Sequence, residues 1–169
     1  MDQSPKYNPN IHHRRSIRLQ GYDYSNEGMY FITINTYKMK HVFGSIKDDK
    51  MVLNEFGIIA DEEWFNLTNL FINIELDVFQ VMPNHIHGII VILTKTENNK
   101  KTIGDIVGAY KSLVSNKCLD IYKAKDEVMG KLWHRNFYEH IIRDKDSYHR
   151  ISEYIINNPA NWMNDKFYS

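Results

Sequence analysis

The sequence predicts an α+β domain of the ferredoxin-like type, in which helices pack on one face of an antiparallel sheet. The first observation is the order of the hydrophobic patterns, which run strand, helix, strand, strand, helix, strand, with an inserted hairpin and an extra C-terminal helix. The second is that a helix-capping residue, Asn54, Thr102 or Asp144, precedes each helical pattern. A length of 169 residues with 43% hydrophobic residues favours one domain.

The first elements follow from alternation and turn chemistry. Residues 28–37 alternate and are rich in β-branched and aromatic side chains, which predicts a strand. Residues 41–54 predict a short hairpin that turns at the cluster Asp48-Asp49-Lys50. Asn54 then predicts the start of a helix over about residues 55–71.

Two strands are expected next, over residues 74–82 and 85–93, joined by a tight turn at Pro83 and Asn84. The second strand, HIHGIIVIL, is apolar at almost every position. A strand with two apolar faces is buried on both sides, so we expect residues 85–93 to be central in the sheet.

The second half of the chain predicts two helices and one strand. Residues 102–124 carry apolar side chains at helical spacing, and Thr102 with Asp105 forms a capping-box pattern. Residues 132–143 are expected to form the fourth strand of the sheet. Asp144 predicts the cap of a last helix, which Pro159 stops near residue 158.

The composition excludes several classes of protein. One cysteine, Cys118, excludes a disulfide framework within the chain and favours a reducing cytosol, so we expect a cytoplasmic location. The longest apolar stretch is too short to span a bilayer. The sequence has no Gly-rich phosphate-binding loop, so we expect no nucleotide cofactor. The formal net charge is +0, so nucleic-acid binding has to come from local basic patches. Residues 1–20 are expected to be a basic arm and residues 163–169 a tail.

Two histidines, His85 and His87, stand at the start of the apolar central strand. Alternate residues of a strand project from the same face, so both imidazoles can ligate one cation. Two histidines that satisfy their hydrogen bonds at a strand start are the structural alternative. The polar pair conflicts with its apolar surroundings, which is typical of a site. The sequence lacks the cysteine spacing of closed zinc sites and favours an open metal site.

The last predicted helix can supply further groups. Tyr148, Ile151 and Ile155 share one face and should form its buried stripe. Tyr154 lies beside that stripe, and Asn158 follows it by four residues, which places both side chains on one edge of the helix. From spacing alone, a boundary tyrosine and a C-terminal cap before Pro159 are the favoured interpretation of the two residues.

Three blocks of the sequence, VMPNHIHGI, LWHRNFYEHIIR and YIINNPANW, resemble the signature blocks of the REP-associated tyrosine transposases. These are single-tyrosine HUH transposases of bacterial insertion sequences. The segment from Arg14 to Tyr37 also resembles one branch of that family. The likeness covers roughly residues 14–162, so it implies a single HUH transposase catalytic domain over residues 21–162.

The resemblance implies roles for individual residues. His85 and His87 match the HUH motif, and Tyr154 matches the nucleophile, with Tyr138 and Tyr148 as alternatives. Asn158 matches the residue that completes a site for Mg²⁺ or Mn²⁺ in related enzymes, although its capping role competes.

The resemblance also implies the reaction and the partner. The expected activity is metal-dependent cleavage of single-stranded or hairpin DNA and strand transfer through a 5′-phosphotyrosine, by a monomer or a homodimer. A hairpin-binding regulator without transposition and a phosphohydrolase that uses water are the alternatives. The candidate DNA contacts are Arg14, Arg15, Arg18, Lys111, Arg135 and Arg143.

Overall fold

The computed structural model describes residues 21–93 and 101–168. The predicted arginines 14, 15 and 18 therefore lie outside the described residues. The elements are β1 (Gly28–Asn35), β2 (Gly44–Lys47), β3 (Lys50–Leu53), α1 (Glu55–Leu70), β4 (Ile74–Val81), β5 (His85–Ile92), α2 (Ile103–Ala124), β6 (Tyr138–Ile142) and α3 (Lys145–Asn157), with short 3-10 turns at Tyr37–Met39 and Trp162–Asn164. None of the described helices is both long enough and apolar enough to cross a bilayer.

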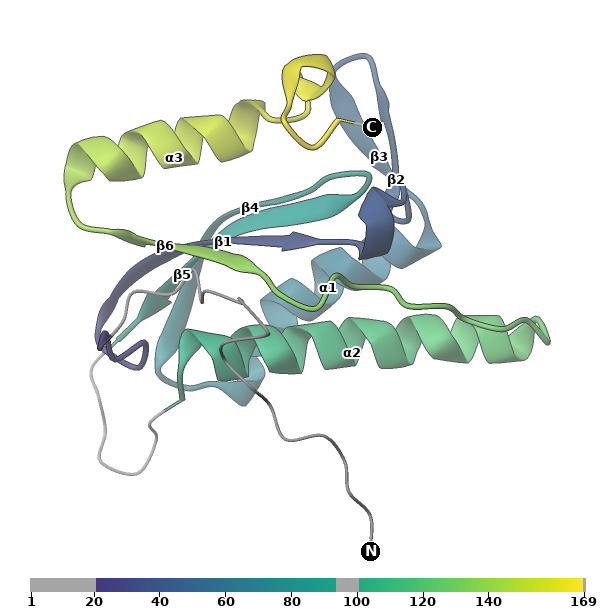
Figure 1. Cartoon of the computed structure of the whole chain (residues 1–169), viewed down its shortest axis with the longest axis horizontal. Helices are drawn as coiled ribbons and strands as arrows, with labels where there is room; N and C mark the ends of the chain where they lie inside the picture. Colours follow the sequence, from purple (N-terminus) through teal and green to yellow (C-terminus); the bar gives the residue numbers. More distant parts are fainter. Residues whose placement is uncertain (1–20, 94–100, 169) are drawn as a thin grey trace, which may run out of the picture.

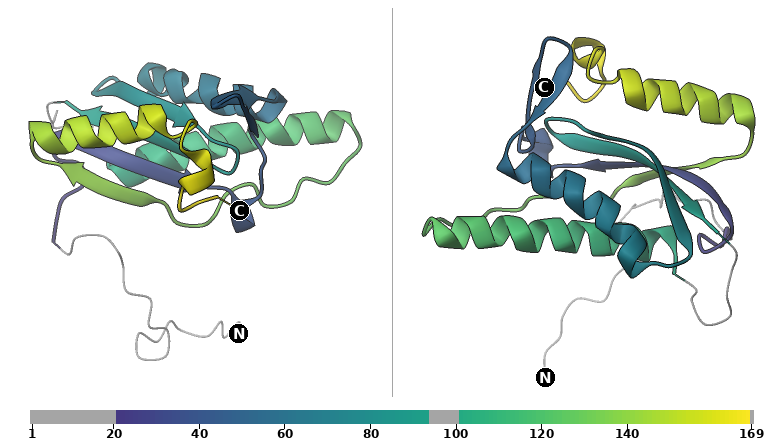
Figure 2. Two further views of the ribbon diagram at one scale, coloured as in Figure 1. Left: turned by 90° about the horizontal axis from the view of Figure 1, so that it is seen from above. Right: turned by 180° about the vertical axis from the view of Figure 1, so that it is seen from behind.

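The predicted ferredoxin-like sheet is confirmed. Its four strands lie in the order β4-β5-β1-β6, and every neighbouring pair is antiparallel. As expected, β5 is an inner strand, and β2 with β3 forms the separate inserted hairpin. Helices α1 and α2 cover one face of the sheet, whereas α3 lies across the other (Figure 1). The views from above and from behind show the same three layers (Figure 2).

The predicted caps are all present. Asn54 accepts hydrogen bonds from the backbone N–H groups of the first turn of α1. Thr102 and Asp105 form the reciprocal capping box of α2. The Asp144 carboxylate accepts from the Ser147 N–H at 2.7 Å and starts α3 directly after β6. These local contacts fix where each helix begins, and hence where its side chains point.

The fourth strand is shorter than the sequence predicts. Residues 138–142 pair with β1, but residues 132–137 run outside the sheet, with one bridge between Trp133 and Thr36. Leu132 and Trp133 are consecutive and both pack in the same core cluster, whereas consecutive side chains of a regular strand point to opposite faces. The Lys111 ammonium group also donates to the carbonyls of His134 and Arg135 and holds this segment against α2.

The main core lies between the sheet and the pair α1 and α2. Trp64 of α1 is fully buried and stacks on Phe79 of β4 with ring centroids 4.4 Å apart. Gly88 of β5 passes directly beneath this ring: a Cβ atom there would lie 2.3 Å from the Trp64 indole. A second, smaller cluster of Phe31, Ile89, Ile142 and Ile155 packs between the sheet and α3.

Candidate active site

The two histidines of β5 lie on the sheet face that α3 covers. His85 pairs with Asn35 and His87 with Thr33 of β1, so both side chains project toward α3. Their ring centroids are 4.5 Å apart, and both side chains are fully buried. Ile86 between them enters the main core on the opposite face. The predicted orientation of the pair is therefore confirmed.

The hydrogen bonds of His85 define its tautomer. Its Nδ1 lies 2.8 Å from Oδ1 of Asn84, whose amide nitrogen donates to the Phe167 carbonyl. Because Oδ1 of Asn84 can only accept, the network assigns the proton of His85 to Nδ1. Nε2 then carries a lone pair, and this atom is buried with no hydrogen-bond partner among the described residues.

Tyr154 reaches this pair from α3. Its hydroxyl oxygen lies 3.2 Å from Nε2 of His87 and donates to the Asp165 carboxylate at 3.0 Å. Tyr154 has one phenolic hydrogen, and it is donated to Asp165. His87 Nε2 is therefore the donor in the hydrogen bond with the Tyr154 oxygen. Nδ1 of His87 then accepts from the Thr33 hydroxyl at 2.9 Å. Tyr154 as a residue is 38% exposed, so it is not sealed from solvent.

Asn158, one turn after Tyr154, completes the edge of α3 that the sequence predicted. Its amide nitrogen donates to the Asp165 carboxylate at 2.5 Å. Its Oδ1 atom is buried and has no partner among the described residues. Asn158 is the C-cap residue of α3, and its backbone N–H donates to the Ile155 carbonyl while its side chain turns toward the site, so the capping role and the contact with the site occur together.

The chain after α3 supplies residues that the sequence reasoning missed. Residues 159–164 form turns that bring Asp165 back to Tyr154 and Asn158. The Phe167 ring packs on His85 with centroids 4.7 Å apart. The predicted tail region therefore lines the site. A contact formed by reversal of the chain follows neither a helical nor a strand period, so no sequence signal marked Asp165.

Burial controls the protonation of the site. It lowers the pKa of His85 to about 4, against a smaller opposing effect of the Asp165 carboxylate. Burial and the neighbouring His85 ring also lower the pKa of His87 well below its ordinary range. Burial and the Asp165 charge raise the pKa of Tyr154. At neutral pH the imidazoles are thus neutral and the phenol keeps its proton.

The residues fit a divalent cation. One ligand atom from each of His85, His87 and Asp165 can be chosen such that all three lie within 4.8 Å of one another. Nε2 of His85 and Oδ1 of Asn158 are buried acceptors that lack a protein donor. Such orphaned acceptors cost free energy unless a ligand satisfies them. Neutral imidazole with amide or carboxylate oxygen is a mixed nitrogen and oxygen donor set that can hold a divalent cation.

The two alternative tyrosines have other contacts. The Tyr148 hydroxyl donates to the Asp77 carboxylate of β4 at 2.9 Å, which ties α3 to the sheet. Tyr138 is 46% exposed on β6, and the Lys166 ammonium lies 5.9 Å from its ring centroid. Of the three candidates, only Tyr154 makes a described hydrogen bond to a histidine of the pair.

The described basic candidates are dispersed. Lys111 is engaged with backbone carbonyls, and burial lowers the pKa of its ammonium group. Arg135 is exposed in the segment before β6. Arg143 follows the end of β6 that pairs with Met29, which is the end of the sheet opposite the histidines. These three residues stay predicted DNA contacts.

Sequence comparison finds one family model and one curated relative. The family described as "Transposase IS200 like" matches residues 33–158, which span β1 to the end of α3. A protein of Haemophilus influenzae strain Rd, described only as uncharacterized, is 40% identical over 180 aligned positions. That alignment covers 96% of this chain and 97% of the relative.

Structure comparison finds a similar architecture in solved structures, among them two transposases. A REP-associated tyrosine transposase bound to a REP hairpin matches with a TM-score of 0.63 and 17% identity, over 88% of this chain and 74% of the other. A presumed transposase from Deinococcus radiodurans matches with a TM-score of 0.51 and 18% identity, over 84% of this chain and 97% of the other. At these identities the likeness establishes the fold.

Proposed function

Because this chain belongs to the IS200-like transposase family, we propose that it cleaves single-stranded DNA and transfers the cut strand, with Tyr154 as the nucleophile. The contact that carries the proposal is the 3.2 Å approach of the Tyr154 hydroxyl to Nε2 of His87. It places a phenol, the nucleophile type of this reaction, beside a buried pair of neutral imidazoles.

His85, His87 and Asn158 would hold a divalent cation, Mg²⁺ or Mn²⁺, which would supply the positive charge that polarises the scissile phosphate. His85 already presents its Nε2 lone pair. His87 has to move its proton from Nε2 to Nδ1, where the Thr33 hydroxyl oxygen can accept the hydrogen bond. This shift also releases Tyr154 from His87.

The Tyr154 oxygen attacks phosphorus, and its proton passes along the existing hydrogen bond to the Asp165 carboxylate. The bond from phosphorus to the 3′-oxygen breaks, and Asp165 returns the proton to that oxygen. The products are a 5′-phosphotyrosine and a free 3′-hydroxyl. The phosphodiester energy is kept in the protein–DNA bond, so attack by another 3′-hydroxyl joins the strand elsewhere without a nucleotide cofactor.

The substrate class is single-stranded DNA that contains a hairpin. The solved structure of similar fold holds a REP hairpin, and the sequence blocks of this chain resemble those of the same group. We therefore choose imperfect palindromic hairpins as the first substrates for testing.

The decisive experiment incubates the protein with end-labelled hairpin oligonucleotides and Mn²⁺ or Mg²⁺, and searches for a protein–DNA adduct that resists denaturant. We expect an adduct with the wild-type chain and none with Tyr154→Phe. Tyr148→Phe is the matched control, because it removes a tyrosine hydroxyl from the same helix. The Tyr148 hydroxyl donates to Asp77 and not to the histidine pair. An adduct that persists in Tyr154→Phe would overturn the nucleophile.

Two further outcomes separate the rival functions. Cleavage without any adduct would identify a phosphohydrolase that uses water. Hairpin binding without cleavage, for any metal and any hairpin, would identify a DNA-binding regulator. Asp165→Asn tests the proton acceptor: it should slow adduct formation by about 10²- to 10⁴-fold and leave hairpin affinity unchanged.

A further inference from the structure

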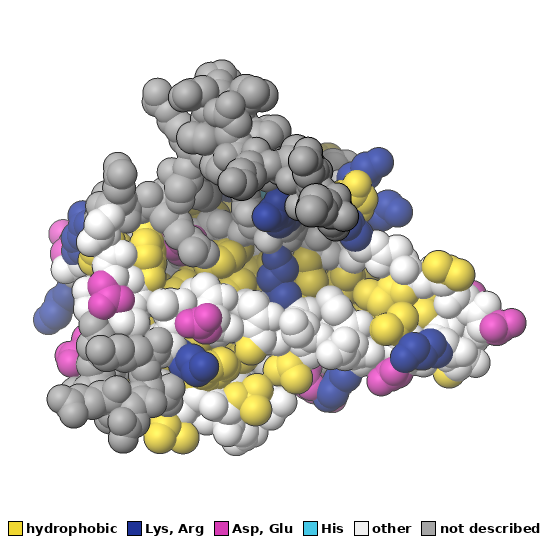
Figure 3. All heavy atoms as spheres, turned by 60° about the horizontal axis from the view of Figure 1, so that its bottom comes forward, with side chains coloured by type: hydrophobic (Ala, Val, Ile, Leu, Met, Phe, Trp, Pro, Cys, Tyr) yellow, Lys and Arg dark blue, Asp and Glu magenta, His cyan; other side chains and the backbone are white. Residues whose placement is uncertain are grey.

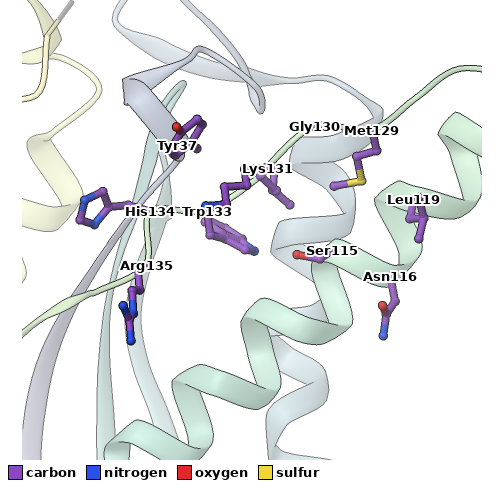
Figure 4. Close-up of a pocket in the computed structure, with 11 residues that line it drawn as sticks. Tyr37, Ser115, Asn116, Leu119, Met129, Gly130, Lys131, Trp133, His134 and Arg135 are labelled. Atoms are coloured by element: carbon purple, nitrogen blue, oxygen red, sulfur yellow. The ribbon is translucent and has the colours of Figure 1, made fainter. Parts of the chain in front are cut away.

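A second site of different character lies on the α2 side of the sheet, whereas the histidine site lies on the α3 side. A pocket of about 600 Å³ opens between the second half of α2 and residues 129–135 (Figure 4). Its wall is made of three kinds of side chain: apolar, small polar and cationic. It contains neither the histidines of the pair nor Tyr154.

We propose that this pocket binds one unpaired nucleotide of the DNA substrate, with the base inside and its phosphate at the cationic rim. The proposal rests on the proposed function, because the strand that enters the pocket is the strand that Tyr154 cuts. It adds a site that fixes the register of that strand.

The pocket has a rigid aromatic and apolar interior. Trp133, which lines it, packs against Phe43 and Tyr110 with centroids 5.3 and 6.0 Å apart. Its indole N–H donates to the Lys111 carbonyl at 3.1 Å, which fixes the ring plane. Leu119 and Met129 extend the apolar wall. A preformed apolar cavity holds a flat ligand without a large ordering cost.

Polar groups on α2 can read the edge of a base. Ser115 and Asn116 line the pocket, and Figure 4 shows the Ser115 hydroxyl pointing from α2 toward Trp133. A hydroxyl and an amide together offer donors and acceptors, which is the chemistry of base-edge recognition. A few polar groups in an apolar pocket favour a heterocyclic base over a purely aliphatic ligand.

The rim carries positive charge that no acid balances. Lys131 and Arg135 line the pocket, and no lining residue is acidic. Both side chains are exposed, and neither forms an ion pair with a carboxylate of the described residues. Figure 3 shows the face that carries α2, where hydrophobic, basic and acidic side chains are interspersed. An apolar hole with a cationic rim is complementary to a base and its phosphate.

The pocket and the histidine site share one end of β1. The Tyr37 N–H, on the pocket side, donates to the Leu132 carbonyl at 2.8 Å. The preceding Thr36 N–H donates to the Asn84 carbonyl at 2.9 Å, directly before His85. The His134 N–H also donates to the Asn35 carbonyl, opposite His85 in the sheet. A strand that bends around this end of β1 can therefore contact both sites.

The test measures binding of a hairpin oligonucleotide with a single-stranded flank, in which each flanking position in turn is made abasic. We expect one position at which loss of the base lowers affinity about 5- to 100-fold, the usual effect of one stacked base. Ser115→Trp, which fills the pocket from α2, should lower affinity for the intact strand equally. It should also remove the difference between the intact and the abasic strand.

The controls separate this proposal from the proposed function. Binding is measured with Tyr154→Phe as the background, so it does not need cleavage. Arg135→Gln should weaken binding several-fold and reduce the position-specific abasic effect, whereas Arg143→Gln, a predicted DNA contact at the far end of the sheet, should leave that abasic effect unchanged. Arg135→Gln also keeps the test decisive if Ser115→Trp does not fold. Adduct formation without any position-specific abasic effect would overturn the pocket and leave the nucleophile intact.

One last measurement distinguishes DNA from free nucleotide as the ligand. Deoxynucleoside monophosphates share the base and phosphate but lack the neighbouring strand, so we expect them to bind at least about 100-fold more weakly than the oligonucleotide. Equal affinity for a monophosphate and for the strand would contradict a DNA register site.

Discussion

The two faces of the sheet differ in the polarity of the side chains that they bury. The face toward α1 and α2 is a continuous apolar core around fully buried aromatic residues such as Trp64 and Tyr110. The face toward α3 has a four-residue apolar cluster, and beside it lie the fully buried His85 and His87. One face can supply most of the folding free energy, so the other can tolerate buried polar groups whose hydrogen bonds are incomplete.

Because one face stabilises the fold and the other carries the candidate site, substitutions on the two faces should have different effects. Substitutions on the α1 and α2 face should change the free energy of unfolding, whereas those on the α3 face should change metal binding and chemistry. The predictions below test that contrast, beginning with the largest expected effect.

Trp64→Ala should remove most of the packing of the core face and destabilise the chain by about 3–5 kcal/mol. The measurement is urea unfolding followed by circular dichroism. Tyr154→Phe, on the opposite face, should change the free energy of unfolding by no more than about 1 kcal/mol. Equal losses for the two variants would break the contrast between the faces.

Acid should destabilise the metal-free chain through the α3 face. The unfolded His85 has an ordinary pKa near 6.5, but burial lowers its folded pKa to about 4. Between these values the unfolded state binds the extra proton, so stability is full above pH 6.5 and falls toward pH 4, by about 3 kcal/mol. Urea unfolding in chelator across this range measures the loss, and His85→Gln should show a shallower dependence.

Metal should stabilise the α3 face specifically. At a Mn²⁺ concentration 100 times its Kd, the folded state gains about 2.7 kcal/mol, which thermal unfolding detects as a higher Tm. His87→Ala should lose this gain while remaining folded. Tyr148→Phe should keep it, because its hydroxyl bonds Asp77 rather than the histidines. A Tm shift that survives in His87→Ala would place the metal elsewhere.

One substitution made at two glycines should have opposite signs. Gly88→Ala would push a Cβ atom against the Trp64 ring and should destabilise by about 1–3 kcal/mol. Gly108→Ala, on the exposed side of α2, meets no atom within 4 Å and should stabilise by up to about 1 kcal/mol. Thermal unfolding of the pair gives the smallest effects of this series and locates the tightly packed side of the sheet.

Local sequence signals predicted most of the fold. The caps at Asn54, Thr102 and Asp144 set three helix starts, and the Asp48-Asp49 turn set the hairpin. Both aspartates have positive φ angles, near 48° and 59°, which suits a tight hairpin turn. The error over residues 132–137 arose because tertiary contacts, the burial of Trp133 among them, overrode the strand propensity of that segment.

The site was predictable only where its geometry is periodic. The two-residue spacing placed His85 beside His87, and the four-residue spacing placed Tyr154 beside Asn158. The likeness to a family joined these two halves, which spacing alone did not connect. Asp165 enters through a chain reversal, and the pocket wall combines α2 with an irregular segment. Such contacts depend on the completed fold.

Because α3 follows β6 almost directly, its length from Asp144 fixes the position of the proposed nucleophile Tyr154. Asp144 fixes where α3 starts, and Tyr154 is the tenth residue of that helix. Each residue inserted or deleted before Tyr154 would rotate it by about 100° and shift it by about 1.5 Å. One such change would turn the phenol away from His87, whereas an insertion of about seven residues would restore the angle but carry it two turns past the site. The length of this segment is therefore as constrained as its chemistry.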